Sequence, residues 1–307
     1  MICRLLLACS LLLTDFPKLE AQTSQDYSQL WNDLLVLSHD SLEGRKTATI
    51  GSKKAQNYIS SRYQQIGLET IGNKFSHHFT PSRFSLNTDT ATNLIGYLPG
   101  SSDQIILITA HYDHLGIKNG QIYNGADDNA SGVSIILFLA QYFIKAKPTH
   151  SLLFVAYDAE ELGLLGAKAF IKDPPVDLER IILNINLDMV SRSSNNQIYA
   201  CGVYHYPLLG PYLSAVDHKG PVQLLLGHDE PESGKHDWTY SSDHGPFHRR
   251  GVPFLYFGVE DHADYHRSSD TVDKIDQEFF FDVARLILEC ALRLDKGMRF
   301  SGSNNDK

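Results

Sequence analysis

The sequence has little cysteine, little basic charge and few long apolar runs. Of its 307 residues only four are cysteine, and 27 lysines and arginines stand against 36 acidic residues. No basic stripe offsets this acidic balance, which argues against a protein that binds nucleic acid by electrostatics. The chain has no internal repeat and no low-complexity run. Hydrophobic residues make up 42% of it, enough apolar surface to fold as one large domain or two small ones.

The first apolar stretch is too short to cross a membrane. Leu5–Leu13 follows a short basic start at Met1–Arg4. A bilayer span needs about 20 apolar residues, so this stretch suits the core of a secretory signal instead. We predict a cleaved signal over residues 1–21 and an exported protein, periplasmic or extracellular. A lipid anchor on Cys9, which ends a lipobox-like Leu-Leu-Ala-Cys, is a less favoured alternative.

Removal of that signal leaves two cysteines, Cys201 and Cys290. They could pair in an oxidising compartment. We favour two buried free thiols, because one is expected in a strand and the other in a helix. Neither belongs to a Cys-x-x-Cys spacing, which excludes a zinc–thiolate site.

Strands and helices alternate along the rest of the chain, and this alternation predicts an α/β fold. We expect a three-layer sandwich with a central mixed, mostly parallel sheet of about eight strands. Residues 22–300 are predicted to form one domain, and residues 301–307 a frayed tail. The clearest expected strands are 104–109, 151–157, 181–187 and 253–257, and the expected helices are 25–37, 52–66, 131–144, 162–171, 206–216 and 277–294.

Reactive side chains follow these strands, where open α/β sheets place their binding sites. His111 and Asp113 come just after the strand 104–109. Residues two apart in extended backbone share a face, so the Asp113 carboxylate can fix the tautomer of His111. The plain alternative is a histidine and an aspartate in a polar turn.

Two pairs of adjacent acids come next. Asp127 and Asp128 precede an apolar helix, and Glu160 and Glu161 occupy a strand-to-helix turn. Helix capping and the helix dipole explain acids at such positions, but capping accounts for only one of the two aspartates. The functional interpretation is that one carboxylate bridges two metal ions, while one glutamate binds metal and its neighbour takes a proton from bound water.

Asp188 and His266 complete a possible ligand set. An aspartate at the end of the apolar strand 181–187 is costly unless it is paired or ligated. The set supplies two imidazoles and three carboxylates, a mixture that suits zinc, with cobalt or manganese possible. If Asp128 is shared, each of two ions has three protein ligands, as in hydrolytic sites with ions ~3.5–4 Å apart. The five candidate ligands are His111, Asp128, Glu161, Asp188 and His266.

Five ordered motifs resemble those of the co-catalytic di-zinc aminopeptidases. This family comprises the secreted bacterial leucyl aminopeptidases and their relatives, among them aminopeptidase Y and glutamate carboxypeptidase. The resemblance covers most of the chain, from Leu42 to the last helix. The motifs are His111-x-Asp113, Gly125-Ala126-Asp127-Asp128-Asn129-Ala130-Ser131-Gly132, Glu160-Glu161-x-Gly163, Leu187-Asp188-Met189 and Tyr265-His266.

The resemblance implies a zinc metallo-aminopeptidase with two Zn²⁺ per chain. Asp128 would bridge both ions. His111 and Asp188 would complete one site, and Glu161 and His266 the other. The peptide bond after the bridging aspartate is often cis in this family, so Asp128–Asn129 is expected to be cis.

The resemblance also implies the catalytic groups and the partner. The substrate would be a peptide with a free N-terminus, and its N-terminal residue would be hydrolysed by a hydroxide shared between the two zinc ions. Glu160 would be the general base, Asp113 would orient His111, and Tyr265 would donate to the oxyanion. We expect no nucleic-acid partner and no stable membrane span, and we favour a monomer.

Three alternatives stay open at this point. Glutaminyl cyclases resemble the same architecture but use one zinc. A non-catalytic binding module would have a degraded site, whereas all five ligands and Glu160 are present here. A glutamate carboxypeptidase usually carries an inserted domain, for which the stretch Gly96–Gln104 is too short.

Other patterns have less specific interpretations. Ser242–His244 has the letters of a serine triad, but consecutive residues cannot adopt its geometry, and we interpret Ser242 or Asp243 as a helix cap, with contact to the site as the lesser alternative. His77-His78 is expected to be solvated in an edge strand. The stretch Gly227–Tyr240 is either a surface excursion or a loop over the substrate pocket. Arg267 and Asp270 are expected to buttress the His266 turn.

Overall fold

The structure is a computed structural model that describes residues 24–81 and 91–298. The predicted signal over residues 1–21, the alternative anchor at Cys9 and the predicted tail over residues 301–307 lie outside the described residues.

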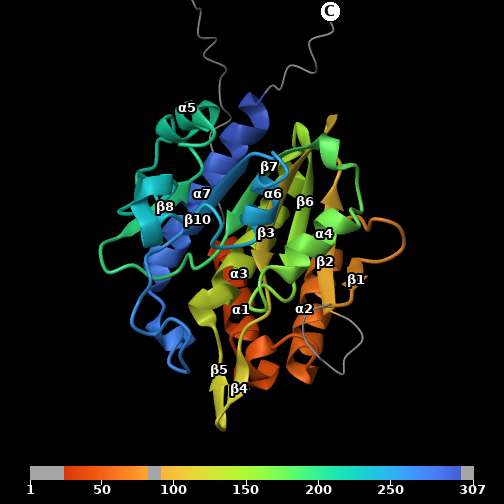
Figure 1. Cartoon of the computed structure of the whole chain (residues 1–307), viewed down its shortest axis with the longest axis vertical. Coiled ribbons are helices and arrows are strands. Elements are labelled where there is room, and N and C mark those ends of the chain that lie inside the picture. Colours follow the sequence, from red (N-terminus) through yellow and green to blue (C-terminus); the bar gives the residue numbers. More distant parts are fainter. Residues whose placement is uncertain (1–23, 82–90, 299–307) are drawn as a thin grey trace, which may run out of the picture.

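One eight-stranded mixed sheet forms the centre of the molecule, in the order β1-β2-β6-β3-β7-β10-β8-β9 (Figure 1). Its four middle strands, β6, β3, β7 and β10, run parallel to one another, while β2 and β8 flank them antiparallel. This confirms the predicted sheet. The strands are β1 (Ser76–Phe79), β2 (Ala91–Leu98), β3 (Ser102–His111), β6 (His150–Tyr157), β7 (Ile181–Leu187), β8 (Gln197–Cys201), β9 (Gln223–Leu226) and β10 (Phe254–Gly258).

Helices cover both faces of this sheet, which completes the predicted three-layer sandwich. On one face α3 packs on β3 and contacts α1, α2 and α7. On the other face α4 and α6 contact each other, and α6 packs on β7 and β10. The helices are α1 (Ser24–Leu37), α2 (Ile50–Ile66), α3 (Gly132–Ala146), α4 (Leu165–Lys172), α5 (Gly210–Ser214), α6 (His244–His248) and α7 (Gln277–Gly297).

The apolar run of β3 explains why both faces are covered. Successive side chains of a strand point to opposite faces, so Ile106 and Ile108 enter the core under α3 while Ile105 and Leu107 enter the core under α4 and α6. All four are at most 1% exposed. A strand buried on both faces reads as a continuous apolar run, which is the pattern of a central parallel strand.

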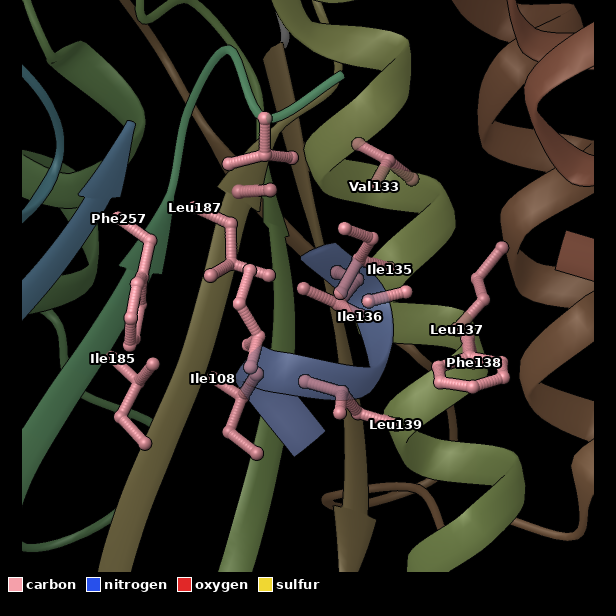
Figure 2. Close-up of a cluster of buried hydrophobic side chains, with 14 of the residues drawn as sticks. Ile108, Val133, Ile135, Ile136, Leu137, Phe138, Leu139, Ile185, Leu187 and Phe257 are labelled. Carbon is pink, nitrogen blue, oxygen red and sulfur yellow. The ribbon is translucent and has the colours of Figure 1, made fainter. Parts of the chain in front are cut away.

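Helix α3 is buried on nearly all sides. Figure 2 shows Ile136 and Leu139 of α3 directed toward Ile108 of β3, while Phe138 points away from the sheet. Phe138 meets the ring of Tyr27 in α1, with 5.7 Å between centroids. Residues 126–146 are apolar and long enough to cross a membrane by length and composition alone, but 72% of that window is buried inside the fold. We therefore interpret this stretch as a core helix.

Two predicted helices were partly wrong. The helix expected at 162–171 begins only at Leu165, because Gly163 and Leu164 have left-handed backbone with φ of 98° and 60°. The helix expected at 206–216 is broken into a short 3₁₀ turn and the five-residue α5. Proline lacks the N–H that a continuing helix needs. Pro207 is the first residue of the 3₁₀ turn, and Pro211 is the second residue of α5.

Two smaller predictions concern the two cysteines and the histidine pair of β1. Cys201 and Cys290 are buried and free, which confirms the favoured interpretation. Strand β1 lies at the sheet edge, as expected, and His78 is exposed, as predicted, whereas His77 is partly buried. The Nε2 atom of His77 lies 3.0 Å from the carbonyl oxygen of Asp173, and Nδ1 of His78 lies 3.1 Å from the Thr92 hydroxyl.

Candidate metal centre

The candidate site lies where the four parallel strands end together. Their carboxyl ends meet at one edge of the sheet, the usual place for a binding site in an α/β fold. His111 is the last residue of β3, Glu160 and Glu161 follow β6, and Asp188 follows β7. His266 is supplied by the longer loop after β10. The five predicted ligands, distant in sequence, are thus brought to one place.

The two oxygens of Asp128 face different imidazoles. Its Oδ1 lies 3.4 Å from Nε2 of His111, and its Oδ2 lies 3.1 Å from Nε2 of His266. Asp188 completes the first group, with Oδ1 3.2 Å from His111 Nε2. Glu161 completes the second, with Oε2 3.4 Å from His266 Nε2. Asp128 is common to both halves, as expected, but the second set of three mutually close ligand atoms consists of His114, Asp128 and Glu161 and does not include His266.

His114 is a buried imidazole that the sequence reasoning missed. Its Nδ1 lies 2.7 Å from Oε1 of Glu161 and 3.6 Å from Oδ2 of Asp128. The His114 side chain is fully buried, whereas that of His266 is 40% exposed. Burial lowers the pKa of His114 to about 3, so its ring is neutral and able to ligate a cation. Its place three residues after His111, in the same strand-end turn, was the available signal.

The hydrogen bond at Nδ1 of His111 directs its other nitrogen toward the acids. Nδ1 lies 3.1 Å from the carbonyl oxygen of Asp113, which can only accept, so Nδ1 carries the proton in the neutral ring. The Nε2 lone pair then faces Asp128 and Asp188, an arrangement that requires a proton or a cation between them. The carboxylate of Asp113, expected to orient this ring, lies farther away, at 3.8 Å from Nδ1.

The carboxylate of Asp113 instead holds the turn after β6. Its oxygens accept the backbone N–H groups of Glu160 at 3.0 Å and of Glu161 at 3.4 Å. The hydroxyl of Thr47 also donates to it. One aspartate therefore fixes the backbone of both glutamates and, through its carbonyl, the ring of His111.

Burial of so many acids makes the site strongly receptive to positive charge. Desolvation, reinforced by Asp188 and Asp243, raises the pKa of Glu160 well above its usual value, although His111 opposes the rise. Desolvation also raises the pKa of Glu161. Burial raises the pKa of Asp188, but the charge on His111 lowers it by more. The pKa of Asp188 therefore lies below its usual value. Bound cations would relieve this repulsion between carboxylates.

The turn that carries Asp128 is held by a further aspartate. The carboxylate of Asp270 accepts the backbone N–H groups of Asp127 and Asp128, each at 3.1 Å. The expectation that Asp270 buttresses the His266 turn was therefore incomplete, because its side chain supports the Asp128 turn. Asp127 points away, accepting from Ser191 at 2.6 Å. The Asp128–Asn129 peptide bond is cis, as expected.

Arg45 hydrogen-bonds to two of the loops that carry candidate ligands. Its buried guanidinium donates to the carbonyl oxygens of Tyr112, Asn124 and Gly125, and also to Leu37. Tyr112 lies beside His111, and Gly125 lies three residues before Asp128. Burial lowers the pKa of Arg45 to about 10, so it stays charged at neutral pH.

Residues of the Ser242–His244 segment border the site. Asp243 is the N-cap residue of α6, but its side chain makes no capping bond there, so the cap interpretation was wrong for its carboxylate. Both of its oxygens are buried and lack a hydrogen-bond partner among the described residues. Burial raises the pKa of Asp243 to about 7, with Asp188 adding to the effect. The lesser alternative, contact with the site, fits these observations.

Tyr265 is the remaining predicted catalytic residue, and it stacks on His266. Their ring centroids are 3.9 Å apart with an interplanar angle of 24°. Burial raises the pKa of the Tyr265 hydroxyl, and the charge of Asp128 adds to the rise, so the hydroxyl stays a donor at neutral pH.

Residues 93–291 match Peptidase family M28. The chain belongs to this family. The matched region contains all five candidate ligands, Asp113, Glu160 and Tyr265, and leaves Arg45 outside.

The chain is similar in sequence to named relatives and shares its fold with solved structures. Aminopeptidase YwaD of Bacillus subtilis is 29% identical over 204 residues, which cover 63% of this chain and 42% of that protein. The structure of BSAP, a zinc aminopeptidase from Bacillus subtilis, superimposes with a TM-score of 0.69 at 18% identity, over 89% of this chain and 96% of that one. A leucine aminopeptidase precursor from Bacteroides thetaiotaomicron gives a TM-score of 0.67 at 16% identity, over 89% and 97%. The chain spans about half the length of the curated relatives it matches.

Proposed function

We propose that this M28 protein is a metal-dependent aminopeptidase that uses two zinc ions to remove the N-terminal residue of peptides. The observation that carries the proposal is the placement of Asp128 between two imidazoles, one at each oxygen. The names of the relatives, an aminopeptidase and a zinc aminopeptidase among them, support the reaction class.

The donor set fits zinc. His111, Asp128 and Asp188 offer ligand atoms that all lie within 4.8 Å of one another, and so do His114, Asp128 and Glu161. Imidazole nitrogens and carboxylate oxygens are usual zinc ligands in hydrolases. When bound, zinc supplies a Lewis acid that polarises the scissile carbonyl and lowers the pKa of water.

Glu160 is the group that moves the proton. Its backbone is fixed by Asp113, and it neighbours the ligand Glu161 without belonging to either donor group. In the proposed reaction its carboxylate takes a proton from the attacking water and delivers it to the departing amine nitrogen. The hydroxyl of Tyr265, stacked beside His266, is proposed to donate to the oxygen of the former carbonyl as negative charge develops there.

The selectivity for chain ends is proposed to come from the surplus of carboxylates. A free α-ammonium group would lie beside Glu160 and Asp188. Burial destabilises the negative charge of a carboxylate there, and a bound cation would offset that cost. A blocked N-terminus has no such charge to offer. We propose that the protein acts on exported or extracellular peptides, after removal of residues 1–21.

The test is metal counting beside substrate assays on one purified preparation. We expect hydrolysis of leucine p-nitroanilide, its loss on chelation and its recovery with zinc. N-acetyl-leucine p-nitroanilide is the matched control and should stay intact. Cyclisation of N-terminal glutamine without hydrolysis of aminoacyl amides would instead identify a glutaminyl cyclase. If the protein neither cyclised glutamine nor hydrolysed leucine p-nitroanilide, it would be a binding module.

A further inference from the structure

A second group of metal-ligating side chains lies outside the candidate catalytic centre. It consists of His228, His236 and Glu260, whose ligand atoms all lie within 4.8 Å of one another. His228 lies in the loop after β9, and His236 ends the short 3₁₀ helix Pro231–His236 that follows. Glu260 belongs to the loop after β10 that continues to His266. None of the three is used by the proposed hydrolysis.

The hydrogen bonds of His228 prepare it as a ligand. Its Nδ1 lies 2.9 Å from the carbonyl oxygen of His236, which can only accept, so Nδ1 carries the proton of the neutral ring. Its Nε2 lies 3.0 Å from Oε1 of Glu260. A lone pair on that nitrogen would face a carboxylate oxygen, which repels it unless a proton or a cation lies between. Metal-bound histidines commonly have this arrangement, one ring nitrogen on the metal and the other donating to a carbonyl.

The surrounding contacts hold His228 in one orientation. Its ring stacks on Trp238 with 3.8 Å between centroids and 5° between planes. The backbone N–H of Trp238 donates to the carbonyl of His228 at 2.6 Å, which closes the loop on itself. Asp229, next in sequence, is buried and accepts the backbone N–H groups of Gly202 and Tyr204. A preformed ligand loses little conformational entropy when a metal binds.

We propose that His228, His236 and Glu260 bind one Zn²⁺ ion, or a similar divalent transition metal, separately from the catalytic pair. Two imidazoles and one carboxylate are a zinc-type set. Because His236 and Glu260 are exposed, the fourth position is open to water. The ion would fasten the loop Gly227–Tyr240 to the segment that carries His266, and so join two loops that have no covalent link.

A simple ion pair is the competing explanation of the same geometry. A doubly protonated His228 would pair with Glu260 and would also stack favourably on Trp238. That explanation gives the ring of His236 no role. Replacement of His236 therefore separates the two, since the ion pair survives it and the metal site does not.

The test compares the zinc content per chain of the wild type and of variants. All proteins are dialysed against the same buffered free zinc in the micromolar range. We expect His236→Ala and Glu260→Gln each to hold one zinc fewer per chain than the wild type, by elemental analysis. Lys235→Ala, on the same exposed turn, is the matched control and should match the wild type. The count at the catalytic centre cancels in this comparison, so a failure of the proposed function does not affect it.

Trp238 provides a second readout. The chain has only two tryptophans, so Trp238 is the one tryptophan that fluoresces in the Trp31→Phe protein. We expect zinc to change this emission saturably in the Trp31→Phe protein, and the change to shrink when His236→Ala is added. Equal zinc content in all four proteins, or a fluorescence response of unchanged size when His236→Ala is added, would overturn the proposal in favour of the ion pair.

Discussion

The carboxylate of Asp113 accepts the backbone N–H of Glu160, with Oδ1 3.0 Å from the nitrogen. This bond links the His-x-Asp motif at the end of β3 to the paired glutamates after β6. A charged acceptor makes such a bond stronger than a neutral one. Asp113 therefore acts through Glu160 as a positioning residue, in addition to holding His111 through its carbonyl.

Asp113→Asn should lower kcat about tenfold or more while zinc stays bound. The amide presents an NH₂ group where one carboxylate oxygen accepted, and a misplaced donor costs about 1–3 kcal/mol. The measurement is kcat and KM for leucine p-nitroanilide beside the zinc content, with the exposed Asp103→Asn as control. An Asp113→Asn enzyme with normal kcat would contradict the positioning role.

Glu160→Gln should retain the metals and lose ~10²–10⁴-fold in kcat, because an amide cannot take the proton from water. Metal retention is expected since Glu160 belongs to neither donor group. The check is the rate of single-turnover hydrolysis together with elemental analysis. Glu69→Gln, exposed and far along the chain, is the control. If Glu160→Gln hydrolysed at the wild-type rate, another residue would have to be the base.

Arg45→Met should destabilise the fold by at least about 3 kcal/mol, because several buried carbonyl groups lose their donor together. We also expect weaker zinc binding, since Arg45 supports the loops of His111 and Asp128. Urea unfolding of the metal-free protein measures the first effect. Arg249→Met is the matched control: this arginine lies over the ring of Tyr240 at the surface, and its loss should cost less than about 1 kcal/mol. Equal losses would contradict the account of Arg45.

The pH dependence of stability should carry the signature of His244. Burial lowers its pKa to about 4, whereas an unfolded histidine titrates near ~6.5. Between these values the unfolded chain binds a proton that the folded chain refuses, so stability falls as pH drops through this window. The contribution amounts to about 3 kcal/mol at the acid end. The free energy of unfolding of the metal-free protein from pH 7 to pH 4 should fall less steeply in His244→Asn. Parallel curves would show that His244 is not the group responsible.

Much of the site could be predicted because strand ends are visible in a sequence. The apolar runs before His111, Glu160 and Asp188 mark buried strands, and parallel strands end at one edge. The two halves around Asp128 followed from that placement and from the family resemblance. The same reasoning also located the core helix α3, which is rich in apolar residues and has six of them in succession over 135–140.

The parts that escaped prediction depend on contacts between distant residues. Arg45 reaches carbonyl groups 67 to 80 positions away, and Asp270 reaches Asp127 across 143 positions. No local pattern reports such bonds. The strand β2 was not predicted, and the hairpin formed by β4 (Gly116–Lys118) and β5 (Gln121–Tyr123) was also missed. The hairpin did have a local signal, since Asn-Gly between two short strands favours its tight turn.

The two-zinc centre can be tested by anomalous scattering from crystals of the zinc-loaded protein. We expect two peaks flanking the carboxylate of Asp128, ~3.5–4 Å apart, one on the side of His111 and the other on the side of His266. The second peak also shows whether His114 or His266 supplies its imidazole. A single peak at this carboxylate, or peaks only elsewhere in the molecule, would contradict the two-zinc centre.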